Sequence, residues 1–296
     1  MTENEFMLAD RIAKIQSINQ QFDLENNAYL SFSGGKDSTV LHYLLDEAIP
    51  GNKIPRVFIN TGIEYKDIYM YAKQMSETNE RFVIFSPGVN IIQMLQEEGY
   101  PFKSKEHSQK VLEYRRGVRS KSHMQYFGFE KSNYSKCPKQ LLYQIENDDL
   151  KISHKCCYRL KKQPIMKWMK ENKKSITITG MRMQEGGNRK RLTCIITDKD
   201  NNLKKFHPLA VVNADFENWF IETRNIKLCK LYYPPFNFTR TGCKGCPFSL
   251  TLDKDLFVMR TLLPAEAKQC ETIWKPVYDE YRRLHYRLSP KNMLDL

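Results

Sequence analysis

Residues 28–48 read AYLSFSGGKDSTVLHYLLDEA, a junction between two kinds of pattern. The run before the glycines is short, apolar and aromatic, as in a buried strand, whereas apolar residues within 40–45 recur at helical spacing. Gly34 and Gly35 therefore lie at a strand-to-helix turn, where they allow backbone angles and a close approach that a Cβ would block. The first free N–H groups of the helix carry partial positive charge. The stretch predicts a turn that binds phosphate.

The polar residues of the turn add charge and donors. Lys36 supplies a full positive charge, and Asp37 is a candidate Mg²⁺ ligand. The Walker A spacing and the G-x-G-x-x-G pattern are both absent. The six residues SGGKDS resemble instead the pyrophosphate loop (PP-loop) of ATP pyrophosphatases, which cleave ATP between the α and β phosphates. The resemblance implies ATP and Mg²⁺ as ligands, bound by Ser33, Gly34, Gly35, Lys36, Asp37 and Ser38.

Further strands are expected downstream of the turn. RVFINTG (56–62) and RFVIFSP (81–87) read as buried strands around a helix at 64–78, and 175–179 reads as a fourth strand. This βαβα order predicts an α/β fold with a doubly wound, mostly parallel sheet and a site at the carboxyl ends of its strands. Their position at a strand end places three more residues near the adenosine: Asn60, Thr61 and Gly62.

The composition is that of a basic, globular protein. The chain has 296 residues and a formal net charge of +13. No run approaches the roughly 20 apolar residues of a membrane span, and the N-terminus lacks an apolar signal core, so we expect a cytoplasmic protein. We expect a PP-loop domain over 1–250, with a basic insert at about 101–155 where periodicity weakens, and a helical C-terminal extension over 251–296.

The positive charge is concentrated in two stretches. Residues 103–139 carry a net charge of +7 and residues 151–174 carry +8. Solvated lysine faces are one explanation. A nucleic-acid surface is the other, because aromatic residues interleave with the charges as they do where bases stack. The aromatic residues are Tyr114, Tyr126, Phe127, Phe129, Tyr134, Tyr143, Tyr158 and Trp168.

Four of the eight cysteines form two close pairs. HKCCYRLKKQP holds Cys156 and Cys157, and TRTGCKGCPF holds Cys243 and Cys246. In a reducing cytoplasm a C-x-x-C motif indicates metal binding or redox chemistry rather than a structural disulfide. Thiolates from both pairs can meet around one centre, either an iron–sulfur cluster or structural zinc, and the absence of metal is the remaining alternative.

Several ordered segments widen the resemblance. CCYRLKKQP, ITGMRMQEGGNR, HPLAVVNADFENWFIETRNIKLCKLYY and GCKGCPF resemble, in this order, the phosphoadenosine phosphosulfate reductase family over about residues 25–250. They are most similar to its adenylylsulfate reductase branch, in which the four cysteines hold a [4Fe–4S] cluster. The resemblance implies the adenine nucleotide α-hydrolase-like fold. It places Gly180, Arg182 and Arg189 on the phosphate or acceptor side, and Lys161 and Lys162 facing substrate and cluster.

Two departures separate this chain from the reductases. It lacks their C-terminal Glu-Cys-Gly-x-His-like segment, whose cysteine attacks the sulfonucleotide, and Cys270 lies instead in a helical context, KQCETIW. The intact SGGKDS resembles their ATP-cleaving relatives, the nucleotide-binding subunit of ATP sulfurylase and the ATP pyrophosphatase of DNA phosphorothioation systems.

Three functions follow as hypotheses. The first is an ATP pyrophosphatase that adenylates an acceptor, nucleic acid by the charge pattern, for sulfur transfer from a donor protein. Lys36, Asp37, Arg182 and Arg189 would be its catalytic residues. The second is a sulfonucleotide reductase that uses Cys270 or an outside thiol. The third is a non-catalytic, metal-containing module that binds nucleic acid or regulates.

Overall fold

A computed structural model describes residues 1–133 and 136–289. The chain forms two compact units, each made of two segments. Unit 1 comprises residues 1–87 and 164–242, and unit 2 comprises 88–163 and 243–296. Tyr134, one of the aromatic residues of the basic stretches, lies outside the described residues.

Unit 1 is built on a six-stranded sheet in the order β3-β2-β1-β4-β6-β5. Neighbouring strands are parallel except for β5, which pairs antiparallel with β6. The mostly parallel α/β sheet predicted from the sequence is confirmed, and the β5–β6 edge was not predicted. The strands are β1 Ala28–Ser31, β2 Arg56–Ile59, β3 Phe82–Phe85, β4 Ile176–Ile178, β5 Ile195–Thr197 and β6 Leu203–Phe206.

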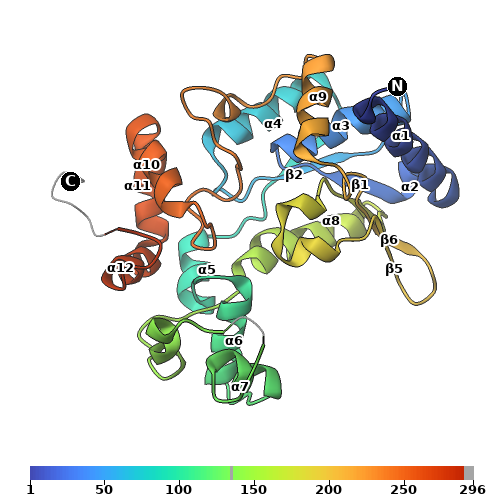
Figure 1. The fold of residues 1–296 in the computed structure, drawn as a ribbon. Helices are drawn as coiled ribbons and strands as arrows, with labels where there is room; N and C mark the ends of the chain where they lie inside the picture. Colours follow the sequence, from blue (N-terminus) through green and yellow to red (C-terminus); the bar gives the residue numbers. More distant parts are fainter. Residues whose placement is uncertain (134–135, 290–296) are drawn as a thin grey trace. The chain divides into compact units, whose positions relative to one another are not determined.

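Helices cover both faces of this sheet (Figure 1). Tyr29 of β1 contacts Trp168 of α8 with ring centroids 5.5 Å apart, whereas Phe32, of opposite side-chain parity, contacts Tyr71 of α4. A sheet packed on both faces requires apolar strands, and Tyr29, Leu30 and Phe32 are all buried. The helices associated with the sheet are α1 Glu3–Phe22, α2 Leu24–Asn27, α3 Lys36–Ala48, α4 Lys66–Thr78, α8 Gln163–Glu171 and α9 Ala214–Thr223.

The strand order reverses beside β1. The chain runs from β1 through β2 to β3 on one side, then continues at β4 on the other side of β1. In doubly wound sheets a ligand binds at the carboxyl ends of the strands at such a switch point. The SGGKDS loop follows β1 and Gly180 follows β4, so both lie at this point.

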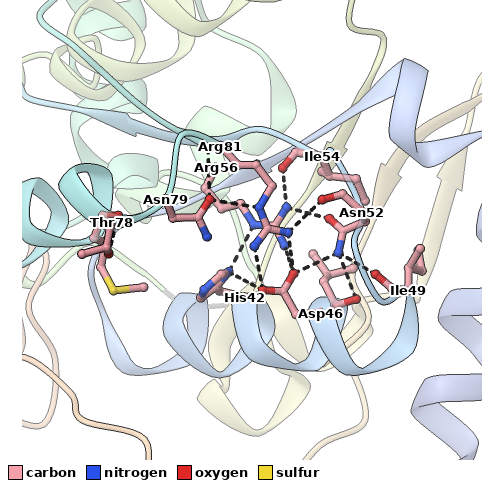
Figure 2. A network of polar contacts seen from close by, with 11 residues as sticks. His42, Asp46, Ile49, Asn52, Ile54, Arg56, Thr78, Asn79 and Arg81 are labelled. Carbon is pink, nitrogen blue, oxygen red and sulfur yellow. Dashed lines mark hydrogen bonds and ion pairs between the residues drawn. The ribbon is translucent and has the colours of Figure 1, made fainter.

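A buried polar network occupies the amino ends of β2 and β3 (Figure 2). The Arg56 side chain is fully buried and donates to Asp46, Asn52 and His42. Arg81 donates to both carboxylate oxygens of Asp46, at 2.7 and 2.9 Å. Burial alone raises the pKa of Asp46, but the hydrogen bonds of Arg81 and the charge of Arg56 outweigh it and lower that pKa. The network thus fixes α3 to the sheet with an ionised carboxylate.

Unit 2 is mainly helical. Its first segment holds α5 Ile91–Glu98, α6 Lys105–Arg115, α7 Lys121–Phe127, η1 Lys139–Ile145 and the π-helical turn η2 Tyr158–Lys162. Its second segment holds α10 Leu252–Leu262, α11 Pro264–Ile273 and α12 Lys275–Arg283. The basic insert is therefore more regular than its weak periodicity suggested. The remaining short helical turns lie in unit 1: η3 Met183–Glu185, η4 Gly187–Arg191 and η5 Lys230–Tyr232.

The segments of unit 2 are held together by aromatic contacts. The rings of Phe102 and Tyr281 lie 4.6 Å apart, and the Tyr281 hydroxyl accepts a 2.7 Å hydrogen bond from the Lys103 amide. Across residues 1–133 and 136–289, no helix is both long and apolar enough to cross a membrane.

Candidate functional site

The SGGKDS loop in unit 1 has the geometry of a tight strand-to-helix turn. Gly34 has φ +70°, and a Cβ there would lie 2.9 Å from the Cγ2 atom of Ile68. Gly35 caps α3, and its carbonyl accepts hydrogen bonds from the hydroxyls of Ser38 and Thr39 at 2.9 and 3.1 Å. The Ser33 amide donates to the Ser38 hydroxyl. Glycine is therefore required at position 34 by both conformation and space.

Two residues from the end of unit 1 close over this loop. The Lys36 amide donates to the Tyr232 hydroxyl at 3.1 Å, and that hydroxyl lies 2.5 Å from the Thr241 Oγ1. A Cβ on Gly35 would lie 3.2 Å from the same tyrosine oxygen. One of the loop amides at the helix start is thus occupied by a neutral hydroxyl, which an anionic phosphate oxygen would have to displace.

Gly180 brings the end of β4 against the loop. A Cβ at this position would lie 2.8 Å from the backbone oxygen of Asp37. Any other residue would push the two backbones apart. The close approach of two neighbouring strand ends is therefore the physical reason for glycine here.

Four ionisable side chains converge beside the loop. The Arg182 Nε lies 2.7 Å from Asp37 Oδ1, and its terminal nitrogen lies 3.0 Å from Glu217 Oε2. The Lys36 Nζ lies 3.4 Å from the same Glu217 oxygen. Lys36, Asp37 and Arg182, predicted as catalytic, thus lie together, and Glu217 of α9 joins them.

Glu217 is the most buried member of this group. Its side chain is 0% exposed, and its two oxygens lack a well-aligned hydrogen-bond donor among the described residues. Burial first, and then the charge of Asp37, raise the pKa of Glu217 to about 8, against the opposing effect of Arg182 and Lys36. These surroundings favour the protonated form of Glu217, which can donate to Asp37.

Arg189 contributes to the same field. Burial and then the positive charge of Arg240 lower its pKa, while Asp37 raises it. Arg182 and Arg240 therefore both lie within electrostatic range of Arg189. The surroundings of Asp37 are rich in cations, which is the environment that a polyphosphate requires.

The three residues after β2 are placed differently from one another. Thr61 is buried, and both its amide and its hydroxyl donate to the carboxylate of Glu64 at 2.8 to 2.9 Å. The Gly62 amide donates to the Asn60 side chain, and Gly62 has φ +83°. The hydroxyl of Thr61 thus serves this turn, whereas Asn60 and Gly62 remain more accessible.

Sequence reasoning missed Glu217, Tyr232 and Thr241. Glu217 lies in FENWF, where it is an acidic residue beside Phe216 and Phe220 on the buried face of the helix, and that is the one signal available for it. Tyr232 and Thr241 carry no local signal, because they reach the loop from about 200 residues away in the chain.

The four paired cysteines all belong to unit 2. The Sγ atoms of Cys156 and Cys157 lie 4.0 Å apart. The hydrogen bond of Cys156, together with Lys105 and Lys161, lowers the pKa of Cys157 to about 6. Burial, and then the charges of Cys243 and Cys157, raise the pKa of Cys246 to about 12. Each thiol pair is therefore within electrostatic range of the other.

The two pairs nevertheless do not meet at one point. Across residues 1–133 and 136–289, no three His, Cys, Asp or Glu side chains are arranged to hold a metal ion. Zinc bonds its sulfur ligands at about 2.3 Å, so four thiolates around it must come within about 4 Å of one another. A four-iron cluster is larger and its ligands lie further apart.

Cys270 is structural by its surroundings. Cys270 is 1% exposed and packs against Gly245, where its Sγ lies 2.8 Å from the position of a Cβ. Burial raises its pKa to about 12. It is therefore not an accessible thiolate, which removes it as the nucleophile of a sulfonucleotide reductase.

The basic insert differs from the expected stacking surface. Tyr126 and Phe127 are each 3% exposed and pack against each other, so they cannot stack on bases as predicted. Arg115 donates to the carbonyls of Gln144 and Leu150 and so closes the insert on itself. Tyr158, by contrast, is 46% exposed.

The chain matches a known family model over most of its length. Residues 27–129 and 103–249 match the phosphoadenosine phosphosulfate reductase domain. An uncharacterized protein of Methanocaldococcus jannaschii is 24% identical over 255 residues, which are 82% of this chain and 49% of that protein. The chain thus spans about half the length of this curated relative.

Solved structures are similar at low identity. Phosphoadenylyl-sulfate reductase from Candida auris, a phosphate complex, has 15% identity and a TM-score of 0.45 over 77% of this chain and 87% of that one. FMN adenylyltransferase from Candida glabrata with FAD and inorganic pyrophosphate has 16% identity and a TM-score of 0.47 over 82% and 65%. These values are too low to assign a reaction.

Proposed function

The chain belongs to the phosphoadenosine phosphosulfate reductase domain family, and within it we propose an enzyme that cleaves ATP to AMP and pyrophosphate while adenylating an acceptor. The observation that carries the proposal is the convergence of Lys36, Arg182 and Gly180 on an intact SGGKDS loop at the switch point of the sheet. This arrangement supplies amides and cations for a leaving pyrophosphate.

In the proposed reaction an acceptor oxygen attacks the α phosphorus. A bond forms between that oxygen and the phosphorus, the bond to the α–β bridging oxygen breaks, and its electron pair leaves with pyrophosphate. Lys36 and the loop amides bind the β and γ phosphates, and Arg182 and Arg189 stabilise charge on the transferring oxygens. Asp37 would hold Mg²⁺, which would supply further positive charge to the phosphates, while Glu217 holds its proton and so adds no negative charge near them.

The finer proposal concerns the acceptor and the metal. We propose nucleic acid as the acceptor, activated for sulfur transfer from a donor protein, because a basic surface has no obvious use with a small inorganic acceptor. We further propose that Cys156, Cys157, Cys243 and Cys246 hold a [4Fe–4S] cluster, with zinc as the alternative. Such a cluster would supply single-electron redox chemistry.

Pyrophosphate exchange tests the reaction. Purified protein with ATP, Mg²⁺ and an acceptor should incorporate labelled pyrophosphate into ATP or release AMP. Release of ADP without AMP would contradict the proposal. Release of sulfite from a sulfonucleotide would favour the reductase alternative, with an outside thiol as nucleophile. An exchange-silent protein that binds nucleic acid would favour the non-catalytic alternative.

Anaerobic purification tests the metal. Iron and acid-labile sulfide should be present with visible charge-transfer absorbance, and Cys156→Ala or Cys243→Ala should lose both together with stability. Cys194→Ala is the matched control and should keep them. Colourless protein with stoichiometric zinc would show that the cysteines bind zinc instead of a cluster. Full metal content in both single variants would show that these cysteines are not the metal ligands.

A further inference from the structure

A basic pocket lies in unit 2 beside the Cys156–Cys157 pair. Its volume is about 500 Å³, and Cys157 forms part of its wall. One carboxylate, that of Glu98, is part of its lining. The lining also holds four cationic side chains, those of Lys105, Lys155, Arg159 and Lys162. A pocket of this size with such an excess of positive charge is complementary to a bound anion.

Glu98 neutralises only part of this charge. Its carboxylate lies 3.4 Å from the Lys155 Nζ and 2.8 Å from the Arg159 Nε. Lys105 interacts with the thiol of Cys157. Since one carboxylate serves two of the four cations, the pocket keeps a net positive charge.

Two further features of the pocket indicate what the anion carries. The ring of Tyr158 is 46% exposed, so it offers a free face next to the cations. The Nδ1 atom of His154, in the same lining, is buried without a hydrogen-bond partner among the described residues. A phosphate group joined to a planar base satisfies the cations and the tyrosine at once.

We infer that this pocket binds a nucleotide unit of single-stranded nucleic acid, with its phosphate between Lys155 and Arg159 and its base on Tyr158. The inference rests on the proposed function in taking nucleic acid as the acceptor, and it moves the contact from the buried Tyr126 and Phe127 to the η2 turn. Phosphate binding and stacking are separable, so each is tested by its own variant.

Affinity for oligo(dT) is measured with the whole chain across a salt series. Tyr158→Ala should weaken binding roughly 5- to 150-fold, and Tyr158→Phe should restore it. The double variant Lys155→Gln/Arg159→Gln should flatten the slope of log affinity against log salt by about 0.7, since the two cations neutralise one phosphate and each neutralised phosphate in single strands contributes about 0.7. Phe257→Ala and Lys254→Gln, on exposed positions of α10, are matched controls and should bind as the unaltered protein does.

Free phosphate, dTMP and oligo(dT) are compared as ligands. Tighter binding of the oligonucleotide supports the inference, whereas equal affinity for inorganic phosphate, or unchanged oligo(dT) binding in both the Tyr158→Ala and the double variant, overturns it. Pyrophosphate exchange is followed in parallel. If pyrophosphate exchange occurs but the variants bind oligo(dT) as the unaltered protein does, the nucleotide site in this pocket is wrong and the proposed reaction stands. If the variants weaken oligo(dT) binding but no pyrophosphate exchange occurs, the proposed reaction is wrong and the site stands.

Discussion

Unit 1 places two carboxyl groups among cations, at opposite ends of one sheet, and shifts their pKa values in opposite directions. Asp46, at the amino ends of β2 and β3, accepts hydrogen bonds from Arg56, Arg81 and Asn52, and its pKa is lowered. Glu217, at the carboxyl ends, has Arg182 and Lys36 nearby without well-aligned donors, and its pKa is raised to about 8.

The difference lies in exposure and in hydrogen bonding: the Asp46 side chain is 30% exposed and accepts several hydrogen bonds, whereas the Glu217 side chain is 0% exposed and lacks well-aligned donors among the described residues. A buried carboxylate remains ionised when hydrogen bonds replace the water that it lost, and it takes up a proton when they do not. The Asp46 network is complete within the protein, as a structural element requires. Around Glu217, the positive charge of Lys36 and Arg182 is only partly neutralised by carboxylates. A phosphate-binding site requires such excess positive charge, which the bound phosphate then neutralises.

The largest expected effect is on stability at the complete network. Asp46→Asn should lower the free energy of unfolding by about 3 to 5 kcal/mol, because it leaves the fully buried Arg56 without its counter-charge. Urea unfolding measures this loss. Glu47→Gln, which removes a partly exposed ion pair with Arg224, is the control and should cost less than about 1 kcal/mol. Equal losses of unfolding free energy in Asp46→Asn and Glu47→Gln would show that the Asp46 network contributes no more than an exposed ion pair.

The second effect is on the reaction at the incomplete group. Lys36→Ala should lower pyrophosphate exchange on the order of 100-fold, or about 3 kcal/mol, since one stabilising contact to the leaving group is lost. Its free energy of unfolding should change little, because a protonated Glu217 does not need this cation. If Lys36→Ala instead lowers the free energy of unfolding strongly and keeps pyrophosphate exchange, the role of Lys36 is structural, as that of Arg56 is.

The sequence was informative where interactions are local. The β1 strand, the SGGKDS turn and α3 are contiguous, so their pattern predicted the turn, and β1 to β4 occur where expected. Gly180 came from family resemblance and lies against Asp37. Glu217 and Tyr232 reach the loop only through the fold, so no spacing in the chain indicates them.

The aromatic pattern was misread for a physical reason. Charged and aromatic residues alternate along an amphipathic helix as well as along a stacking surface. In α7 the apolar side of the helix is turned inward, so Tyr126 and Phe127 form part of the interior of unit 2. The sequence of the helix alone does not specify whether its aromatic face is buried in the protein or exposed to a ligand.

A further effect is the titration of Glu217 itself. Its pKa in the folded protein is about 8, above the ordinary value of 4.5, so the stability that its protonation contributes is fully present below pH 4.5 and is lost as pH rises through 8. Glu217→Gln keeps a neutral side chain of the same size but removes the titratable group. The difference in unfolding free energy between the two proteins should therefore change across pH 4.5 to 8 in favour of the variant. Other groups, such as His42, titrate equally in both proteins and cancel.

Nucleotide affinity gives the same titration a functional readout. Above pH 8 the ionised Glu217 competes with phosphate for Lys36 and Arg182, so the unaltered protein should bind a non-cleavable ATP analogue more weakly, while Glu217→Gln should not show this loss. Calorimetric titration from pH 6.5 to 9 measures both proteins under identical ionic strength. If the two affinities fall in parallel, Glu217 is ionised throughout, and the contrast with Asp46 reduces to burial alone.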